Sequence, residues 1–221
     1  MRNDLELQID QLRGSVISMG ERADRMMGDA LTALAEGDLT AAELVVEADA
    51  ALDRSYEQVQ HGVLAVVALH GPVGRDLRLL TSLIHVSLHL ERMGDYAVNV
   101  ARTFQRAAGF AGDQDLTEQL LEMGGLARDV GRGALQAFVR FDADMAREAA
   151  AIDERVDRFN DGIFHRLVAL ATESEDRLEW ATRMIQLTRQ LERFADHGVD
   201  VAEQAVFVST GESVELSSEL R

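Results

Sequence analysis

The sequence has no cysteine among its 221 residues, only one proline and few aromatic residues, which make up 5% of the chain. Without cysteine the chain forms no disulfides, thiolate zinc sites or iron–sulfur clusters and has no cysteine nucleophile, and this fits a reducing cytosol. The scarcity of proline and the abundance of Ala, Leu, Glu and Arg favour helix, because these four residues lose little on entering one. The composition therefore predicts an all-α protein.

Long apolar runs and an excess of basic residues are also missing. No stretch approaches the roughly 20 apolar residues that a membrane-spanning helix needs, and the N-terminus, charged from Arg2 onward, does not resemble an export signal. We therefore expect a cytoplasmic protein. The formal net charge of −17 disfavours nucleic acid as a partner, because such binding normally requires a Lys or Arg patch that displaces counterions from phosphates.

Turn-forming residues divide the chain into six long segments with helical patterns. We expect helices over residues 4–36, 39–70, 73–108, 115–140, 143–172 and 175–209. Asp38, Asp142 and Ser174 are predicted to cap the N-termini of the helices that follow them, since their side chains can accept hydrogen bonds from free backbone N–H groups. Residues 210–221 are expected to form a polar tail.

Apolar stripes repeat between the two halves of the chain. The stripe of the third predicted helix recurs in the sixth, with every position apolar or glycine, and the stripe of the second recurs in the fifth with Asn160 as the one exception. The nearly equal offsets predict an internal duplication in which residues 1–108 and 115–209 each form an antiparallel three-helix bundle. Apolar matches alone are weak support, because any two amphipathic helices can be slid into register.

Four acidic pairs with i,i+4 spacing strengthen the duplication. They are Asp49 and Asp53, Glu91 and Asp95, Asp153 and Asp157, and Glu192 and Asp196. Residues four apart share one helix face, where like charges cost a few tenths of a kcal/mol. If the second and third helices of each half pack side by side, four carboxylates converge, and they need protons or cations to offset their repulsion. The pattern predicts one divalent metal site in each half.

Oxygen ligands favour Mg²⁺, Mn²⁺ or Ca²⁺, and carboxylate-rich bundles also hold iron or zinc, so the metal's identity stays open. Asn99 and Asp200 extend the acidic stripes by one turn and are further candidate ligands or supporting groups. In the alternative interpretation, the acids are solvated or paired with arginines next to them in sequence. These are Arg54, Arg92, Arg158 and Arg193.

The histidines and the missing motifs disfavour an enzyme. A di-iron oxidase bundle uses Glu-x-x-His, but Gly94 and Ala195 stand three residues after Glu91 and Glu192. None of the six histidines has a recognised metal-site spacing, so each is expected at the surface or boundary. No phosphate-binding loop, nucleophile elbow or catalytic triad order occurs. A carboxylate-bridged metalloenzyme and a metal-free structural bundle remain the alternatives.

Three runs resemble motifs of the PhoU family: residues 90–101 and 191–203, which contain the Glu-Arg-x-x-Asp segments, and Gly71-Pro72 with the six residues that follow. The resemblance spans nearly the whole chain in the same motif order. It implies tandem three-helix bundles that bind divalent or multinuclear metal clusters of iron, zinc, magnesium or manganese. The eight paired acids named above would be the ligands.

The resemblance also implies a role. A member of this family would be a non-enzymatic negative regulator of phosphate uptake and phosphate-starvation signalling that links the phosphate ABC transporter ATPase to a membrane sensor histidine kinase. It would form a homodimer and reach the membrane only through these partners. An accessory protein of a different phosphate permease is the alternative. Two departures bear on the metal sites, because Asp200 stands where members often have Asn and Arg102 stands where an acid is usual.

Overall fold

Seven helices form within residues 2–216, which are the residues that this computed structural model describes. They are α1 (Arg2–Glu36), α2 (Leu39–His70), α3 (Arg75–Ala107), α4 (Gln114–Arg140), α5 (Ala143–Ala150), α6 (Asp153–Leu170) and α7 (Glu175–Thr210). The three predicted N-caps are confirmed. Asp38 accepts hydrogen bonds from two backbone N–H groups of α2, Asp142 does the same for α5, and Ser174 accepts one from Arg177 of α7.

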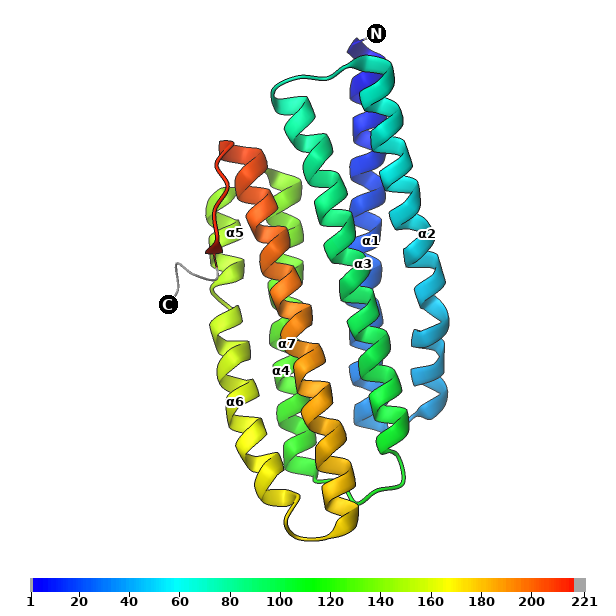
Figure 1. Cartoon of the computed structure of the whole chain (residues 1–221), viewed down its shortest axis with the longest axis vertical. Helices are drawn as coiled ribbons and strands as arrows, with labels where there is room; N and C mark the ends of the chain where they lie inside the picture. Colours follow the sequence, from blue (N-terminus) through cyan, green and yellow to red (C-terminus); the bar gives the residue numbers. More distant parts are fainter. Residues whose placement is uncertain (1, 217–221) are drawn as a thin grey trace.

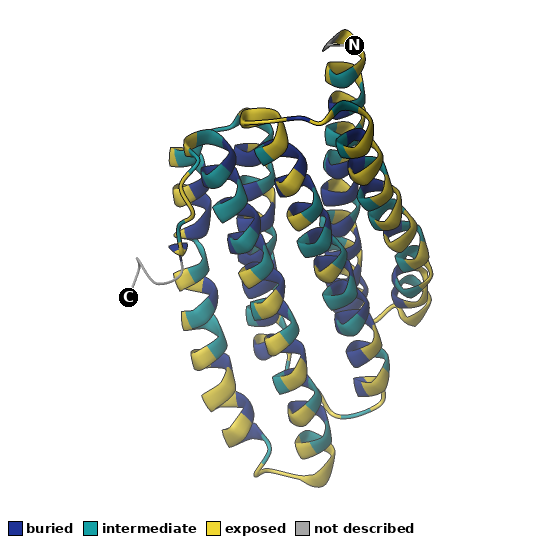
Figure 2. Ribbon diagram, turned by 45° about the horizontal axis from the view of Figure 1, so that its top comes forward, coloured by how far each residue is buried: buried dark blue, intermediate teal, exposed yellow. Residues whose placement is uncertain are grey.

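The helices form two bundles side by side, α1–α3 and α4–α7 (Figure 1). α3 packs along α7 and α1 packs against α4, so these four helices join the halves, while α2 and α6 lie on the outer sides. Buried residues from both halves belong to one continuous core (Figure 2). The predicted all-α architecture of two tandem antiparallel bundles is therefore confirmed.

Exposed residues lie on the helix faces that are turned away from the core (Figure 2). Within residues 2–216, no helix is both long enough and apolar enough to cross a bilayer.

The predicted helix over 143–172 is interrupted, which corrects that expectation. Between α5 and α6 the backbone tightens to i→i+3 hydrogen bonds, from Ile152 N–H to the Ala149 carbonyl and from Arg155 N–H to the Ile152 carbonyl. Ala149 packs against Gly133 of α4, and a Cβ atom added to Gly133 would lie 2.8 Å from the Cβ of Ala149. The turn therefore lies at a close contact between α5 and α4. As a result, Asp153 becomes the first residue of α6.

The chain beyond α7 folds back instead of forming only a polar tail. Gly211 caps the C-terminus of α7, and its φ of 86° lies in the left-handed region that glycine adopts without strain. Leu216 is 3% exposed, and its backbone N–H donates a hydrogen bond of 2.9 Å to Glu203 Oε1 on α7. Residues 217–221 of the predicted tail lie outside the described residues.

Candidate metal centre

Acids of α2 and α3 form the first cluster, as their spacing predicts. Burial and the nearby charges of Asp53 and Asp95 raise the pKa of Asp49 above its ordinary value. Burial, with Asp95 and the two acids of α2, likewise raises the pKa of Glu91, although Arg92 partly opposes the shift. The acids of the two helices therefore act on one another, and Asp49 and Glu91 resist carrying their negative charge.

Acids of α6 and α7 form the second cluster. Burial, followed by the charges of Asp157, Asp196 and Glu192, raises the pKa of Asp153 to about 7. The pKa values of Glu192 and Asp196 are also raised, again chiefly by burial and by neighbouring acids. Asp153 stands at the positive end of α6, which favours a negative charge, so the opposing effects of burial and like charge are the stronger ones here.

The two clusters differ in the positive charge that reaches them. In the first, Arg92 Nη1 lies 3.0 Å from Asp95 Oδ2 and its Nε lies 3.4 Å from Glu91 Oε2. In the second, Arg189 lowers the pKa of Glu192 and Arg193 that of Asp196, and both are secondary to burial and acidic neighbours. The arginine pairing expected under the alternative interpretation is thus present for α3.

Three buried carboxylate oxygens among the described residues accept no hydrogen bond: Asp49 Oδ1, Glu91 Oε2 and Asp153 Oδ1. Each belongs to the first acid of an i,i+4 pair, and the Glu91 oxygen forms an ion pair with Arg92. Buried polar atoms are normally satisfied, and carboxylate oxygens suit hard divalent cations. The donor sets therefore fit metal ions. A bound ion would supply the positive charge that offsets the repulsion.

The carboxylates are not drawn together to metal-binding distances. Among residues 2–216, three potential ligand atoms lie within 4.8 Å of one another in one place only, and that place is outside both acidic clusters. Like charges repel at short range, and Asp53 and Asp196 are exposed, so these side chains are free to point apart. To bind a metal ion, the carboxylate side chains would have to rotate toward one another while the helices stay in place.

The place where ligand atoms do converge was missed by the sequence patterns. It consists of His89 on α3 with His197 and Asp200 on α7. Burial opposes ionisation of Asp200, yet hydrogen bonds from both histidines hold its pKa well below its usual range. Asp200 is therefore a member of this trio. Asn99, the other less certain candidate for a metal ligand, is half-buried on α3.

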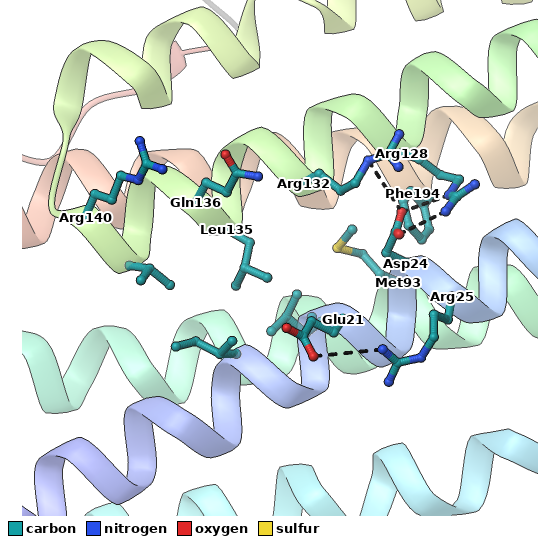
Figure 3. A pocket seen from close by; sticks show the side chains of 15 residues that line it. Glu21, Asp24, Arg25, Met93, Arg128, Arg132, Leu135, Gln136, Arg140 and Phe194 are labelled. Carbon is teal, nitrogen blue, oxygen red and sulfur yellow. Dashed lines mark hydrogen bonds and ion pairs between the residues drawn. The ribbon is translucent and has the colours of Figure 1, made fainter.

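A groove with a volume of about 490 Å³ lies between α1 and α4 (Figure 3). Leu90, Met93 and Phe194 line it from α3 and α7, and charged side chains of α1 and α4 surround it. Leu90 directly precedes Glu91, so α3 presents one face to this groove and an adjacent face to the first acidic cluster. The groove and the candidate metal centres are therefore separate features.

An ion pair crosses this groove and ties the two halves together. Arg128 Nε and Nη2 donate hydrogen bonds of 2.8 and 2.9 Å to the two carboxylate oxygens of Asp24 (Figure 3). A two-point contact of this kind fixes orientation as well as distance. Gly28 leaves room for it, because a Cβ atom there would lie 2.8 Å from the Arg128 guanidinium carbon.

Solved structures resemble this fold closely. The crystal structure of the phosphate transport system regulatory protein PhoU from Streptococcus pneumoniae matches with a TM-score of 0.88 and 27% identity, covering 96% of this chain and 99% of that one. The crystal structure of PhoU from Pseudomonas aeruginosa matches with a TM-score of 0.83 and 28% identity, covering 94% and 99% of the two chains.

Curated relatives match over almost their whole length. A phosphate-specific transport system accessory protein PhoU homolog of Clostridium acetobutylicum is 27% identical over 98% of this chain and 99% of its own. The homolog from Streptococcus pneumoniae is 30% identical over 98% of this chain and 100% of its own. The PhoU domain model matches twice, at residues 16–104 and 120–205, once in each bundle. The chain therefore belongs to the PhoU family.

Proposed function

We propose that this protein is a non-enzymatic, metal-binding regulator of phosphate uptake and phosphate-starvation signalling. Two groups of observations support the proposal. Relatives that align along the full chain are named accessory proteins of the phosphate-specific transport system. The observation that carries the metal-binding part is the pair of carboxylate clusters, in which pKa values are raised and buried oxygens lack hydrogen bonds.

The metal's contribution in this proposal is charge compensation. Glu91 and Asp95 with Asp49 and Asp53 would hold ions between α2 and α3, and the equivalent acids would do so between α6 and α7. Iron, zinc, magnesium and manganese are all compatible with such donors. Bound ions would neutralise the carboxylates and lie partly exposed on an otherwise acidic protein, where open coordination positions could accept oxygen atoms of acidic groups on a partner.

The proposed partners are the ATPase of a phosphate ABC transporter and a membrane sensor histidine kinase, which the protein would contact from the cytoplasmic side as a negative regulator. The transporter is supported by the relatives' names. The kinase and a homodimeric state follow from the resemblance of the Glu-Arg-x-x-Asp motifs alone. A companion role for a different phosphate permease is distinguished by asking which ATPase the purified protein binds.

Deletion of the gene in its own host is expected to raise the output of a phosphate-responsive promoter in phosphate-rich medium to the level seen in starvation. Native protein should restore repression. The Glu91→Gln/Glu192→Gln variant should fail to do so, because each half loses one central carboxylate. Glu57→Gln, which removes the same charge from an exposed position of α2, should behave as native. Unchanged promoter output after deletion would contradict the proposed role.

A further inference from the structure

Two histidines and an aspartate meet where the central helices of the two halves pack together. His89 extends from α3, and His197 and Asp200 extend from α7. The two Nδ1 atoms lie 2.9 Å apart, and they lie 3.1 and 3.0 Å from the same oxygen, Asp200 Oδ2. The three side chains are partly buried, with exposures of 19%, 22% and 40%.

Hydrogen bonds to Asp200 leave the close approach of the two histidine nitrogens unexplained. A neutral imidazole nitrogen is either a donor or an acceptor. If both Nδ1 atoms carry hydrogen, two N–H groups face each other across 2.9 Å, and if only one does, its hydrogen is shared between a nitrogen and the carboxylate. A single cation accepts electron pairs from all three atoms at once. The convergence is therefore better explained by an ion than by hydrogen bonds.

The dimensions of the triangle fit one coordination geometry. Donors held about 2.1 Å from one ion at right angles lie about 3.0 Å apart, whereas a tetrahedral ion at that distance separates them by about 3.4 Å. The observed separations of 2.9, 3.0 and 3.1 Å match the right-angled arrangement. Two imidazoles and one carboxylate on one face of an octahedron, with the remaining positions open, are a recognised ligand set for first-row divalent metals.

Surrounding groups orient the ligands. The second nitrogen of His197, Nε2, lies 3.4 Å from the Tyr96 hydroxyl, and the two rings stack with centroids 5.4 Å apart. An outer partner on one ring nitrogen places the proton there and leaves the other nitrogen free to bind metal. Next to Asp200, Glu203 is fixed by its hydrogen bond from Leu216, so the folded-back end of the chain braces this part of α7.

We propose that His89, His197 and Asp200 form a third metal site, selective for nitrogen-preferring divalent ions such as Fe²⁺ or Co²⁺, that joins the two halves of the protein. It differs from the acidic clusters in its ligands and in its place, because those clusters contain only carboxylates and each lies within one half. Imidazole ligands disfavour Mg²⁺, which the carboxylate clusters accept. This site extends the proposed function but does not depend on it.

Co²⁺ titration of untagged, metal-stripped, full-length protein in a large excess of Mg²⁺ tests the site. Absorption bands of bound Co²⁺ should appear and saturate at one ion per chain. In His89→Gln and in Asp200→Asn protein, affinity should fall by more than the roughly 10–100-fold that loss of an outer partner costs. Asn is the residue at the equivalent position of the first half, Asn99, so Asp200→Asn is expected to fold.

Two controls separate this site from the acidic clusters and from general histidine binding. His85→Gln removes an exposed histidine one turn earlier on α3 and should leave Co²⁺ affinity unchanged. Protein with Asp49→Asn, Glu91→Gln, Asp153→Asn and Glu192→Gln together should keep the Co²⁺ bands even where it loses other metal. Equal Co²⁺ affinity in native, His89→Gln and Asp200→Asn protein would overturn the proposal, as would loss of the bands in the carboxylate variant with the histidines intact.

Discussion

Metal-free protein is expected to lose stability as the pH rises from about 5 to about 8, and saturating Mn²⁺ is expected to reverse that trend. A carboxyl whose pKa is higher in the folded than in the unfolded chain binds more protons when folded, so the free energy of unfolding falls as the pH rises through that interval. For Asp153 the interval runs from 3.8 to about 7. Asp49, Glu91, Glu192 and Asp196 shift in the same direction.

The size of this effect follows from the same shifts. Asp153 alone should destabilise the metal-free protein by about 2 kcal/mol at pH 8, after allowance for solvent screening of a partly exposed group. Saturation by Mn²⁺ at 100 times its dissociation constant should add about 2.7 kcal/mol for each site. Asp200 shifts in the opposite direction, so its contribution is lost only on acidification below its ordinary pKa, outside the range measured.

Urea unfolding at pH 5.5 and pH 8, with chelator or with Mn²⁺, measures both effects. Asp153→Asn should raise the stability of metal-free protein at pH 8 and weaken its pH dependence. Glu154→Gln removes the same charge from the neighbouring, exposed position and should change stability by only a few tenths of a kcal/mol. A metal-free protein whose stability rises from pH 5.5 to pH 8 would contradict this account of the clusters.

Gly198→Val is expected to destabilise the protein by about 3 kcal/mol or more. A Cβ atom at this position of α7 would lie 2.9 Å from Val130 Cγ1 and 3.1 and 3.2 Å from the backbone N and Cα of Gly131 on α4. Backbone atoms inside a helix cannot move aside as a side chain can, so overpacking here should reach or exceed the usual 1–3 kcal/mol. Thermal and urea unfolding would measure the loss.

Gly125→Ala is the matched control for that substitution. Gly125 lies in α4, and an added Cβ atom would meet nothing within 4 Å. Alanine should therefore stabilise the helix by up to about 1 kcal/mol, because it enters helix more readily than glycine. Equal effects at Gly125 and Gly198 would show that α4 and α7 do not approach as closely as described.

The elements that followed from the sequence are those that local chemistry determines. Asp38, Asp142 and Ser174 cap helices because a short polar side chain at this position accepts hydrogen bonds from the free backbone N–H groups of the first turn. The apolar stripes of α3 and α7 likewise fix which faces are buried. Position 198 fitted the stripe as glycine, but the reason for glycine, the backbone of Gly131, is visible only once α4 packs against α7.

Other features depend on packing between elements and have no local signal. Residues 149–151 are three alanines, so no breaker marks the end of α5, and the turn arises from contact with α4. His89 and His197 meet because α3 and α7 lie side by side, which periodicity within one helix does not reveal. Their places on the two duplicated helices, close to the acidic motifs, are the signal in the sequence that could have pointed to the pair.

The acidic clusters were predicted as groups, whereas their difference in charge was not. Arg92 pairs with Asp95 and Glu91 in the first half, while the equivalent Arg193 acts weakly in the second. The direction in which each arginine side chain points decides whether it pairs with an acid, and its position next to an acid in the sequence does not. Because Arg92 competes with a metal for Glu91 and Asp95, the first cluster is expected to hold its metal less firmly than the second.

Metal content tests the central claim, that each half of the duplicated protein carries a carboxylate metal site. Untagged protein purified without chelators should contain divalent metal by elemental analysis. Asp49→Asn/Glu91→Gln should remove the metal of the first half only, and Asp153→Asn/Glu192→Gln that of the second half only, with the second half losing metal more slowly on dialysis of native protein. Metal content that is the same in native protein and in both double variants would contradict the account.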